Sequence, residues 1–246
     1  VNDDLRQLPA AKRAAWSEFL QHALTAKSAK PSAKWKKTAS ALIKSLGAKK
    51  LTDQLVRWFA LVPKGRSIRQ IGMYPGDQRS ASDTMIDENA DILRGLLWCV
   101  PLLPKRYQPP QAVSAVGFSA YKKVPGVGPR AVKVGNAAVY SLSEIGTEDA
   151  VGQLAIMKVR VKFGTAQKQI EKAFDAAATA LGLPRDEIEE LGVPSYGLDE
   201  VGLRTETLGD YRAELRVTGT NAELCWFDSK GKQLKSVPAK VKAESA

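Results

Sequence analysis

Apolar residues in two segments of the chain recur at helical spacing and stop at a glycine. In residues 136–164, Ala138, Leu142 and Ile145 share one helical face, Gly146 follows, and Thr147 offers a cap for a second helix. Glycine readily takes the left-handed conformation that ends a helix. The segment therefore predicts two helices joined by a tight bend, an αα-hairpin.

Residues 38–62 repeat this pattern around Gly47. When Gly47 is aligned with Gly146, apolar positions coincide on both sides of the bend. The two glycines lie 99 residues apart (47 to 146), about twice the ~40–47 residues of one HEAT or armadillo unit. The paired positions are Ala39 with Ala138, Ile43 with Leu142, Leu46 with Ile145, and Leu55 with Leu154.

Residues 87–103 and 109–124 supply the helices expected between the two pairs, with Asp87 as an N-terminal cap. A further helix is predicted from Thr165, as its cap, to Gly182. Neighbouring helices that stack in a row bury apolar faces that no single helix could bury alone. The prediction is a mostly α fold, a HEAT/armadillo-like right-handed helical repeat (α-solenoid), over residues 1–183.

The pattern changes after Gly182. Residues 184–209 are rich in acidic residues, glycine and proline, which indicates a linker with a short helix. Residues 210–246 contain short alternating segments separated by turn sequences, which predict a three-stranded antiparallel β-meander. Residues 68–83 have no sustained period and are expected to form a long surface loop.

Composition adds a strong basic bias to this picture. The 246 residues include 37 Lys and Arg against 26 Asp and Glu, a net charge of +11, which attracts polyanions. No apolar run is long enough to span a membrane and no leader peptide precedes the helices, so a cytoplasmic location is expected. Because the chain begins with valine, we expect it to be part of a longer protein whose other domains are partners.

Cysteine, tryptophan and histidine carry no recognisable chemistry. Cys99 and Cys225 are isolated, which predicts two buried thiols rather than a disulfide or zinc site. The five tryptophans lie in apolar patterns and are expected mostly in cores. His22, the one histidine, is expected to pack or lie on the surface rather than act as a base.

Two long segments, residues 124–154 and 158–173, resemble a bacterial MolR-related family of large uncharacterised multidomain proteins. The resemblance extends over roughly residues 88–244 and is most specific at residues 133–172. It implies a helical repeat region within a larger bacterial protein, some relatives of which carry a WGR-type module associated with nucleic-acid proteins. No WGR stretch occurs here, and the family supplies no catalytic residues to carry over.

The segment "VPGVGPRAV", residues 124–132, resembles a helix-hairpin-helix DNA-binding pattern. In that motif the amides of a Pro-Gly turn, here near Gly126 and Gly128, hold a phosphate at a helix start. The cations Lys122, Lys123, Arg130 and Lys133 would add charge-assisted contacts. The alternative is a structural elbow between two helices, with the lysines in water.

A second basic stretch follows at residues 157–172. If it is helical, Lys158 and Lys162 share a face that Arg160 does not, and Lys168 lies on the next helix. Such a face could line a groove for nucleic acid or an acidic peptide, or be an ordinary solvated surface.

The predicted function is a non-catalytic helical-repeat binding scaffold that presents a basic surface to a polyanionic or acidic partner. No nucleophile and base pair, metal-ligand pattern, Walker loop or dinucleotide fingerprint is recognisable, so neither a cofactor nor a metal is predicted. The alternative is a DNA-binding or DNA-processing enzyme domain that uses the hairpin as a phosphate grip.

Overall fold

The computed structural model describes residues 5–64, 85–182, 187, 198, 202–219 and 221–244. Contacts divide the chain into two compact units, Val1–Val193 and Pro194–Ala246. The boundary falls inside the predicted linker, residues 184–209. Most of that linker lies outside the described residues, as does the whole of the predicted loop at residues 68–83. None of the described helices is both long and apolar enough to cross a membrane.

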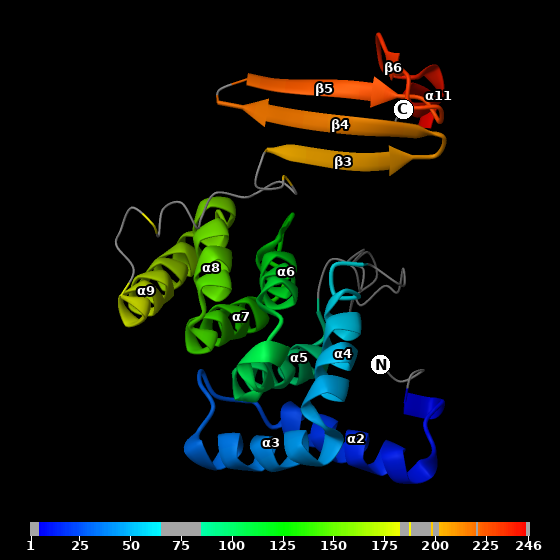
Figure 1. Cartoon of the computed structure of the whole chain (residues 1–246). Coiled ribbons are helices and arrows are strands. Elements are labelled where there is room, and N and C mark those ends of the chain that lie inside the picture. The colour runs from blue at the N-terminus through cyan, green and yellow to red at the C-terminus, as the bar shows by residue number, and fades with distance from the viewer. Residues whose placement is uncertain are drawn as a thin grey trace. The chain divides into compact units, whose positions relative to one another are not determined.

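The first unit is mostly helical, as predicted (Figure 1). Helix α7 packs against α5, α6, α8 and α9, and α5 also packs against α2. One apolar core draws residues from each of the described helices α2 to α9. In chain order the elements are α2 (Ala10–Leu24), α3 (Ala33–Leu46), α4 (Ala48–Phe59), α5 (Asp87–Cys99), the 3-10 turns η1 (Val100–Leu102) and η2 (Lys105–Tyr107), α6 (Pro110–Tyr121), β1 (Lys123–Val124), β2 (Gly128–Pro129), α7 (Val132–Ile145), α8 (Glu148–Arg160) and α9 (Gly164–Leu181).

Both predicted glycine bends are confirmed. Gly47, with φ of 85°, ends α3 and its N–H donates to Ile43 O at 2.9 Å. Gly146, with φ of 58°, ends α7 in the left-handed conformation. Thr147 then caps α8, since its hydroxyl accepts from Ala150 N at 3.3 Å. The eight aligned apolar positions around the two bends are all buried: Ala39, Ile43, Leu46, Leu55, Ala138, Leu142, Ile145 and Leu154.

Two predicted helix caps are wrong. Helix α9 begins at Gly164, with no side-chain cap, so Thr165 lies inside its first turn. Helix α5 begins at Asp87 itself, after Ile86. The Asp87 carboxylate pairs with Lys133 of α7 at 2.9 Å instead of capping α5. A tertiary ion pair has replaced the local hydrogen bond that the sequence suggested.

Aromatic side chains form much of the core, as expected. Trp16 meets Trp58 edge-on with ring centroids 5.4 Å apart, and Trp35 meets Trp98 likewise at 5.3 Å. His22 stacks on Trp35 at 4.6 Å and is therefore a packing residue. All five tryptophans and both cysteines are buried, and the cysteines are free thiols.

The second unit is an antiparallel sheet with strand order β3-β4-β5-β6, one strand more than the predicted meander. The additional strand, β3, lies in the segment assigned to the linker. Its residues are mostly polar and exposed, so the sequence lacks the apolar alternation that predicts a strand. The strand forms by pairing along β4. The elements are β3 (Leu203–Leu208), β4 (Tyr211–Thr218), β5 (Asn221–Phe227), β6 (Gln233–Leu234) and a short helix α11 (Ala239–Glu244).

Candidate functional site

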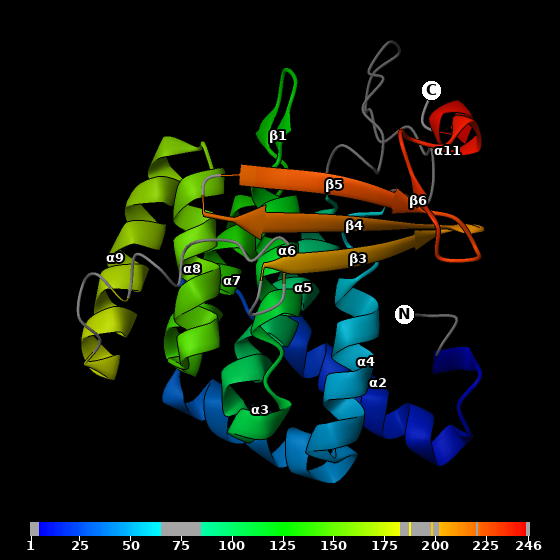
Figure 2. The same cartoon turned by 45° about the horizontal axis from the view of Figure 1, so that its top comes forward.

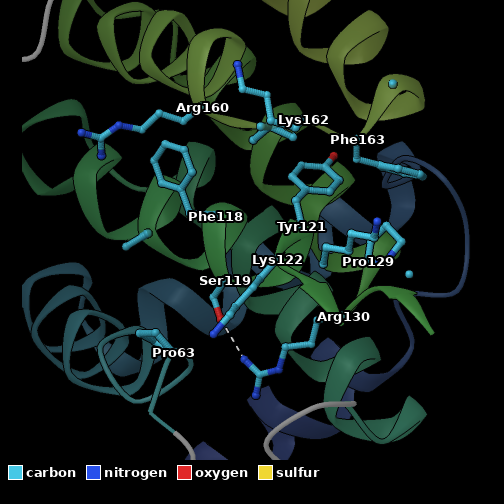
Figure 3. Close-up of a pocket in the computed structure, with 15 residues that line it drawn as sticks. Pro63, Phe118, Ser119, Tyr121, Lys122, Pro129, Arg130, Arg160, Lys162 and Phe163 are labelled. Carbon is cyan, nitrogen blue, oxygen red and sulfur yellow. Dashed lines mark hydrogen bonds between the residues drawn. The ribbon is translucent and has the colours of Figure 1, made fainter. Parts of the chain in front are cut away.

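A pocket of about 1000 Å³ lies in the helical unit, where the α6 to α7 hairpin meets the connection from α8 to α9 (Figure 3). Its volume is at the upper end of the range typical of ligand sites. We call it the basic cleft, because five of its lining residues are cations and none of those that the structure describes is acidic. The lining residues are Pro63, Ala115, Phe118, Ser119, Tyr121, Lys122, Lys123, Gly128, Pro129, Arg130, Arg160, Val161, Lys162, Phe163 and Gly164.

The hairpin on one side of the cleft is a two-stranded ribbon, β1 and β2, which projects from the helices (Figure 2). Val127 N donates to Val124 O at 3.1 Å, and the two residues between them are Pro125 and Gly126. With φ of 71° at Gly126, this is the arrangement of a type II turn, which favours proline followed by glycine. Gly128 also has positive φ, 103°.

The hairpin backbone is open rather than packed beneath a neighbouring helix. Apart from the adjoining residues of the chain, no heavy atom lies within 4 Å of a Cβ built on Gly126 or on Gly128, and Gly126 is exposed. Lys122 and Lys123, at the base of the ribbon, are exposed as well. An open turn beside cations is what a phosphate grip requires, whereas a purely structural elbow does not require it.

Arg130 fixes the hairpin to the helices. Its guanidinium Nη1 donates to Val62 O and to Ser119 Oγ, both at 2.8 Å. Backbone bonds from Arg130 N to Lys122 O, at 3.0 Å, and from Ala131 N to Ala120 O, at 2.8 Å, close the ribbon onto α6. Arg130 therefore lines the cleft chiefly as an anchor, and its positive charge adds to that of the exposed lysines.

The opposite side of the cleft comes from the end of α8. Arg160 is the last residue of that helix, and its guanidinium carbon lies 6.0 Å from the centroid of the Phe118 ring. Lys162 lies in the short connection, is exposed, and donates to Val159 O at 2.9 Å. The predicted common helical face of Lys158 and Lys162 is therefore wrong, because α8 ends between them.

Three aromatic side chains line the cleft between these two sets of cations. Figure 3 shows Phe118, Tyr121 and Phe163 in a row, with Arg160 and Lys162 on one side and Lys122 and Arg130 on the other. Phe118 and Phe163 are half-buried. The rings of Tyr121 and Phe163 have centroids 6.5 Å apart and are tilted by 38°.

Tyr121 is held in place next to Phe163. Its hydroxyl donates to Asn136 Oδ1 at 2.7 Å. A Cβ on Gly135 would lie 2.5 Å from the Tyr121 ring, so α7 needs a glycine there to admit it. Burial raises the pKa of the Tyr121 phenol. The residue is therefore a neutral phenol whose ring is closely packed at the wall of the cleft.

The remaining predicted residues lie outside the cleft. Lys133 binds Asp91 at 2.7 Å and Asp87 at 2.9 Å, so its ammonium group already has two carboxylate partners. Lys158 pairs with Glu171 at 3.2 Å. Lys168 is exposed on α9 but is not a lining residue. Gly126 forms the exposed turn and does not line the cleft itself.

Asp91 organises a second charged cluster, which is structural. Its carboxylate is buried and forms ion pairs with Lys27, with Lys133 and, at 2.6 Å, with Arg94. Burial alone would raise the pKa of this carboxyl, but hydrogen bonds from Lys133, Lys27 and Arg94 outweigh it and hold the pKa well below its usual range. The cluster joins α5 to α7 and to the segment after α2.

The structure thus brings together six of the ten predicted residues: Lys122, Lys123, Gly128, Arg130, Arg160 and Lys162. Sequence reasoning missed the aromatic lining residues, because apolar residues on helices were all assigned to the core. Within the described part of the chain, no group of three or more His, Cys, Asp or Glu is placed to hold a metal ion.

Comparison with protein families, with curated proteins and with solved structures finds no match for this chain. Its resemblance to MolR-related proteins therefore stays a prediction, and any functional argument depends on the geometry of the basic cleft.

Proposed function

We propose that the helical unit is a non-catalytic binding scaffold that holds a polyanion, the phosphate backbone of a nucleic acid, in the basic cleft. The observation that carries the proposal is the convergence of five cations from two distant stretches of sequence on one concave surface without an acidic lining residue. Lysine and arginine contacts to phosphates supply most sequence-independent affinity for nucleic acid.

Four of these cations are available for phosphate contacts. Lys122, Lys123 and Lys162 are exposed at the rim, and Arg160 is exposed beside Phe118. Arg130 is excluded from this count because two hydrogen bonds already hold its guanidinium. If each of the four cations displaces one counterion from a single strand, log K should fall with log salt with a slope of about −3.

The experiment is a fluorescence anisotropy titration of labelled oligonucleotides at two salt concentrations. Binding should weaken about 50-fold between 50 and 200 mM salt for that slope. The variant Lys122→Ala/Lys123→Ala/Lys162→Ala should weaken binding at low salt and flatten the salt dependence to a slope of about −0.7.

A matched control removes three exposed cations elsewhere. Lys34, Lys37 and Lys44 lie exposed on α3 and do not line the cleft. Their replacement by alanine changes the net charge equally, so it should alter binding far less. Absence of binding at low salt, or an equal loss in the two triple variants, would refute the proposal.

The open type II turn at Gly126 favours a second candidate, a DNA-binding or DNA-processing domain that grips duplex phosphates through the hairpin. This candidate predicts that duplex DNA binds as tightly as a single strand and that Lys123→Ala weakens duplex binding. If the domain is an enzyme, incubation should also change the mobility of the DNA strand on a denaturing gel.

We further propose that the helices form a HEAT-like repeat within a larger, MolR-related bacterial protein that acts in the cytoplasm. The glycine bends at Gly47 and Gly146, with equivalent buried positions around them, support the repeat. The other domains of such a protein are the partners expected besides nucleic acid, and an acidic protein is the other polyanionic partner to test.

A further inference from the structure

We infer that the basic cleft binds unpaired nucleic acid in preference to duplex, by stacking bases against Phe118 and Phe163, two partly buried rings that line it. This inference rests on the function proposed above and names the form of nucleic acid that the cleft takes. It depends on the aromatic side chains of the cleft, which the charge argument does not use.

The first step is the position of the rings. Phe118 lies on α6 and Phe163 directly precedes α9, and both line the cleft while only partly buried. A phenylalanine on a helix normally turns its ring into the core. Here the cleft keeps part of each ring in contact with solvent, next to cations that would hold the phosphates (Figure 3).

The second step is the pairing of ring and cation. The Arg160 guanidinium lies beside the Phe118 ring, 6.0 Å from its centroid. Arginine planes and aromatic rings are the surfaces on which proteins stack unpaired bases, while lysines follow the strand's backbone. The cleft has both kinds of surface, with Lys162 beyond the rings and Lys122 across from them.

The third step concerns duplex DNA. In a duplex the bases stack on each other and present only their edges in the grooves, so their faces cannot meet a protein ring. The exposed lysines could touch the phosphates of either form, but Phe118 and Phe163 can contribute only to an unpaired strand. The rings therefore set the preference, and the lysines set the general affinity.

The same rings distinguish nucleic acid from an acidic peptide. Carboxylates need donors and positive charge, and a site for them gains nothing from partly exposed phenylalanines. The lining also includes Pro63 and Pro129, further apolar surface that suits the flat faces of bases. An acidic peptide is thus the less favoured occupant and becomes one outcome of the test.

The site is rigid before binding. Tyr121 is hydrogen-bonded to Asn136, and its ring lies next to that of Phe163. Arg130 ties the hairpin to Ser119 and Val62. A prearranged surface loses little conformational entropy on binding, so stacking energy is available as affinity.

The experiment titrates the whole chain into a labelled twenty-base oligothymidine, into the same strand annealed to its complement, and into both with polyglutamate as competitor. The variants are Phe118→Leu and Phe163→Leu, and the matched controls Phe118→Tyr and Phe163→Tyr keep a ring. Thermal melting of each variant confirms that it is folded. An oligothymidine containing one 2-aminopurine reports stacking directly through its fluorescence.

The wild type should bind the single strand more tightly than the duplex. Each leucine variant should lose about 5- to 150-fold in single-strand affinity, the effect of one lost base stack. Neither should weaken duplex binding, and the tyrosine variants should stay near wild type. Binding of wild type should change 2-aminopurine emission, a readout that does not depend on any variant.

Failure of this inference can be distinguished from failure of the proposed function. Equal affinity for single strand and duplex, with no effect of the leucine variants and a loss in the triple lysine variant, overturns base stacking but leaves phosphate binding intact. Displacement of the strand by polyglutamate at equal charge concentration shows that charge alone decides and also overturns the inference. No binding to any oligonucleotide overturns both.

Discussion

The variant Asp91→Asn tests whether the buried carboxylate holds the helical unit together. The substitution keeps the shape of the side chain and removes its negative charge. Lys27, Arg94 and Lys133, from three separate positions in the sequence, then face an uncharged amide. We expect a loss of folding stability without loss of the fold.

The magnitude follows from the exposure of the three cations. Removal of one partner from a buried ion pair usually costs about 3–5 kcal/mol. The side chains of Lys27 and Lys133 are 64% and 30% exposed, so their ammonium groups can turn to water. The side chain of Arg94 is only 11% exposed and stays buried. The variant therefore leaves one buried cation without its partner, not three. We expect the loss of folding stability to lie near the lower limit of that range, about 3 kcal/mol.

Urea unfolding followed by circular dichroism measures this loss. A change of about 3 kcal/mol corresponds to a melting temperature lower by roughly 6–12 °C in a chain of this size. Asp53→Asn is the control, because Asp53 forms an exposed i,i+4 pair with Lys49 at 2.9 Å, and such pairs contribute about 0.3–0.5 kcal/mol. A loss below about 1 kcal/mol for Asp91→Asn, or equal losses in the two variants, would refute the reasoning.

Three further predictions concern the helical unit. The pKa of Asp91 in the folded protein is held below the ~3.9 of an unfolded aspartate. The stability that the ionised carboxylate contributes is therefore present above that pH and is lost on acidification below about pH 4. In urea unfolding across this range, the free energy of unfolding should fall more steeply for wild type than for Asp91→Asn. Gly95→Ala should destabilise the protein by at least about 1–3 kcal/mol in the same assay, because the new Cβ would lie 2.2 Å from Ala23 O. An unchanged midpoint of urea unfolding would mean that α2 and α5 can move apart at no cost. Burial raises the pKa of the Cys99 thiol, so peptide mapping should find it unmodified by a thiol reagent in native protein and modified in urea, and rapid native labelling would contradict its burial.

The helical bends were predictable because their signals are local. Ala138, Leu142 and Ile145 lie within two turns of Gly146, and the same spacing recurs before Gly47. The lysines around the hairpin were also found locally, as a dense run of charge. The joining of Lys122 and Lys123 with Arg160 and Lys162 depends on the packing of α6 and α7 against α8 and α9, for which no local pattern exists.

Lys133 illustrates the opposite error. It follows Arg130 in a basic run, and its local context resembles that of a phosphate ligand. Its partner Asp91 lies on another helix, and only the packing of α5 on α7 brings the two together. The strand β3 was missed for a related reason, because residues 203–208 form a strand through pairing with β4 rather than through apolar alternation of their own.

The distribution of indole side chains gives the protein a built-in optical label. Trp16, Trp35, Trp58 and Trp98 all belong to the unit Val1–Val193, and Trp226 belongs to Pro194–Ala246. Replacement of Trp226 by phenylalanine would leave tryptophan emission that originates in the helical unit alone. A difference spectrum against the parent protein would then isolate the sheet, so unfolding of each half could be followed in one cuvette without any attached dye.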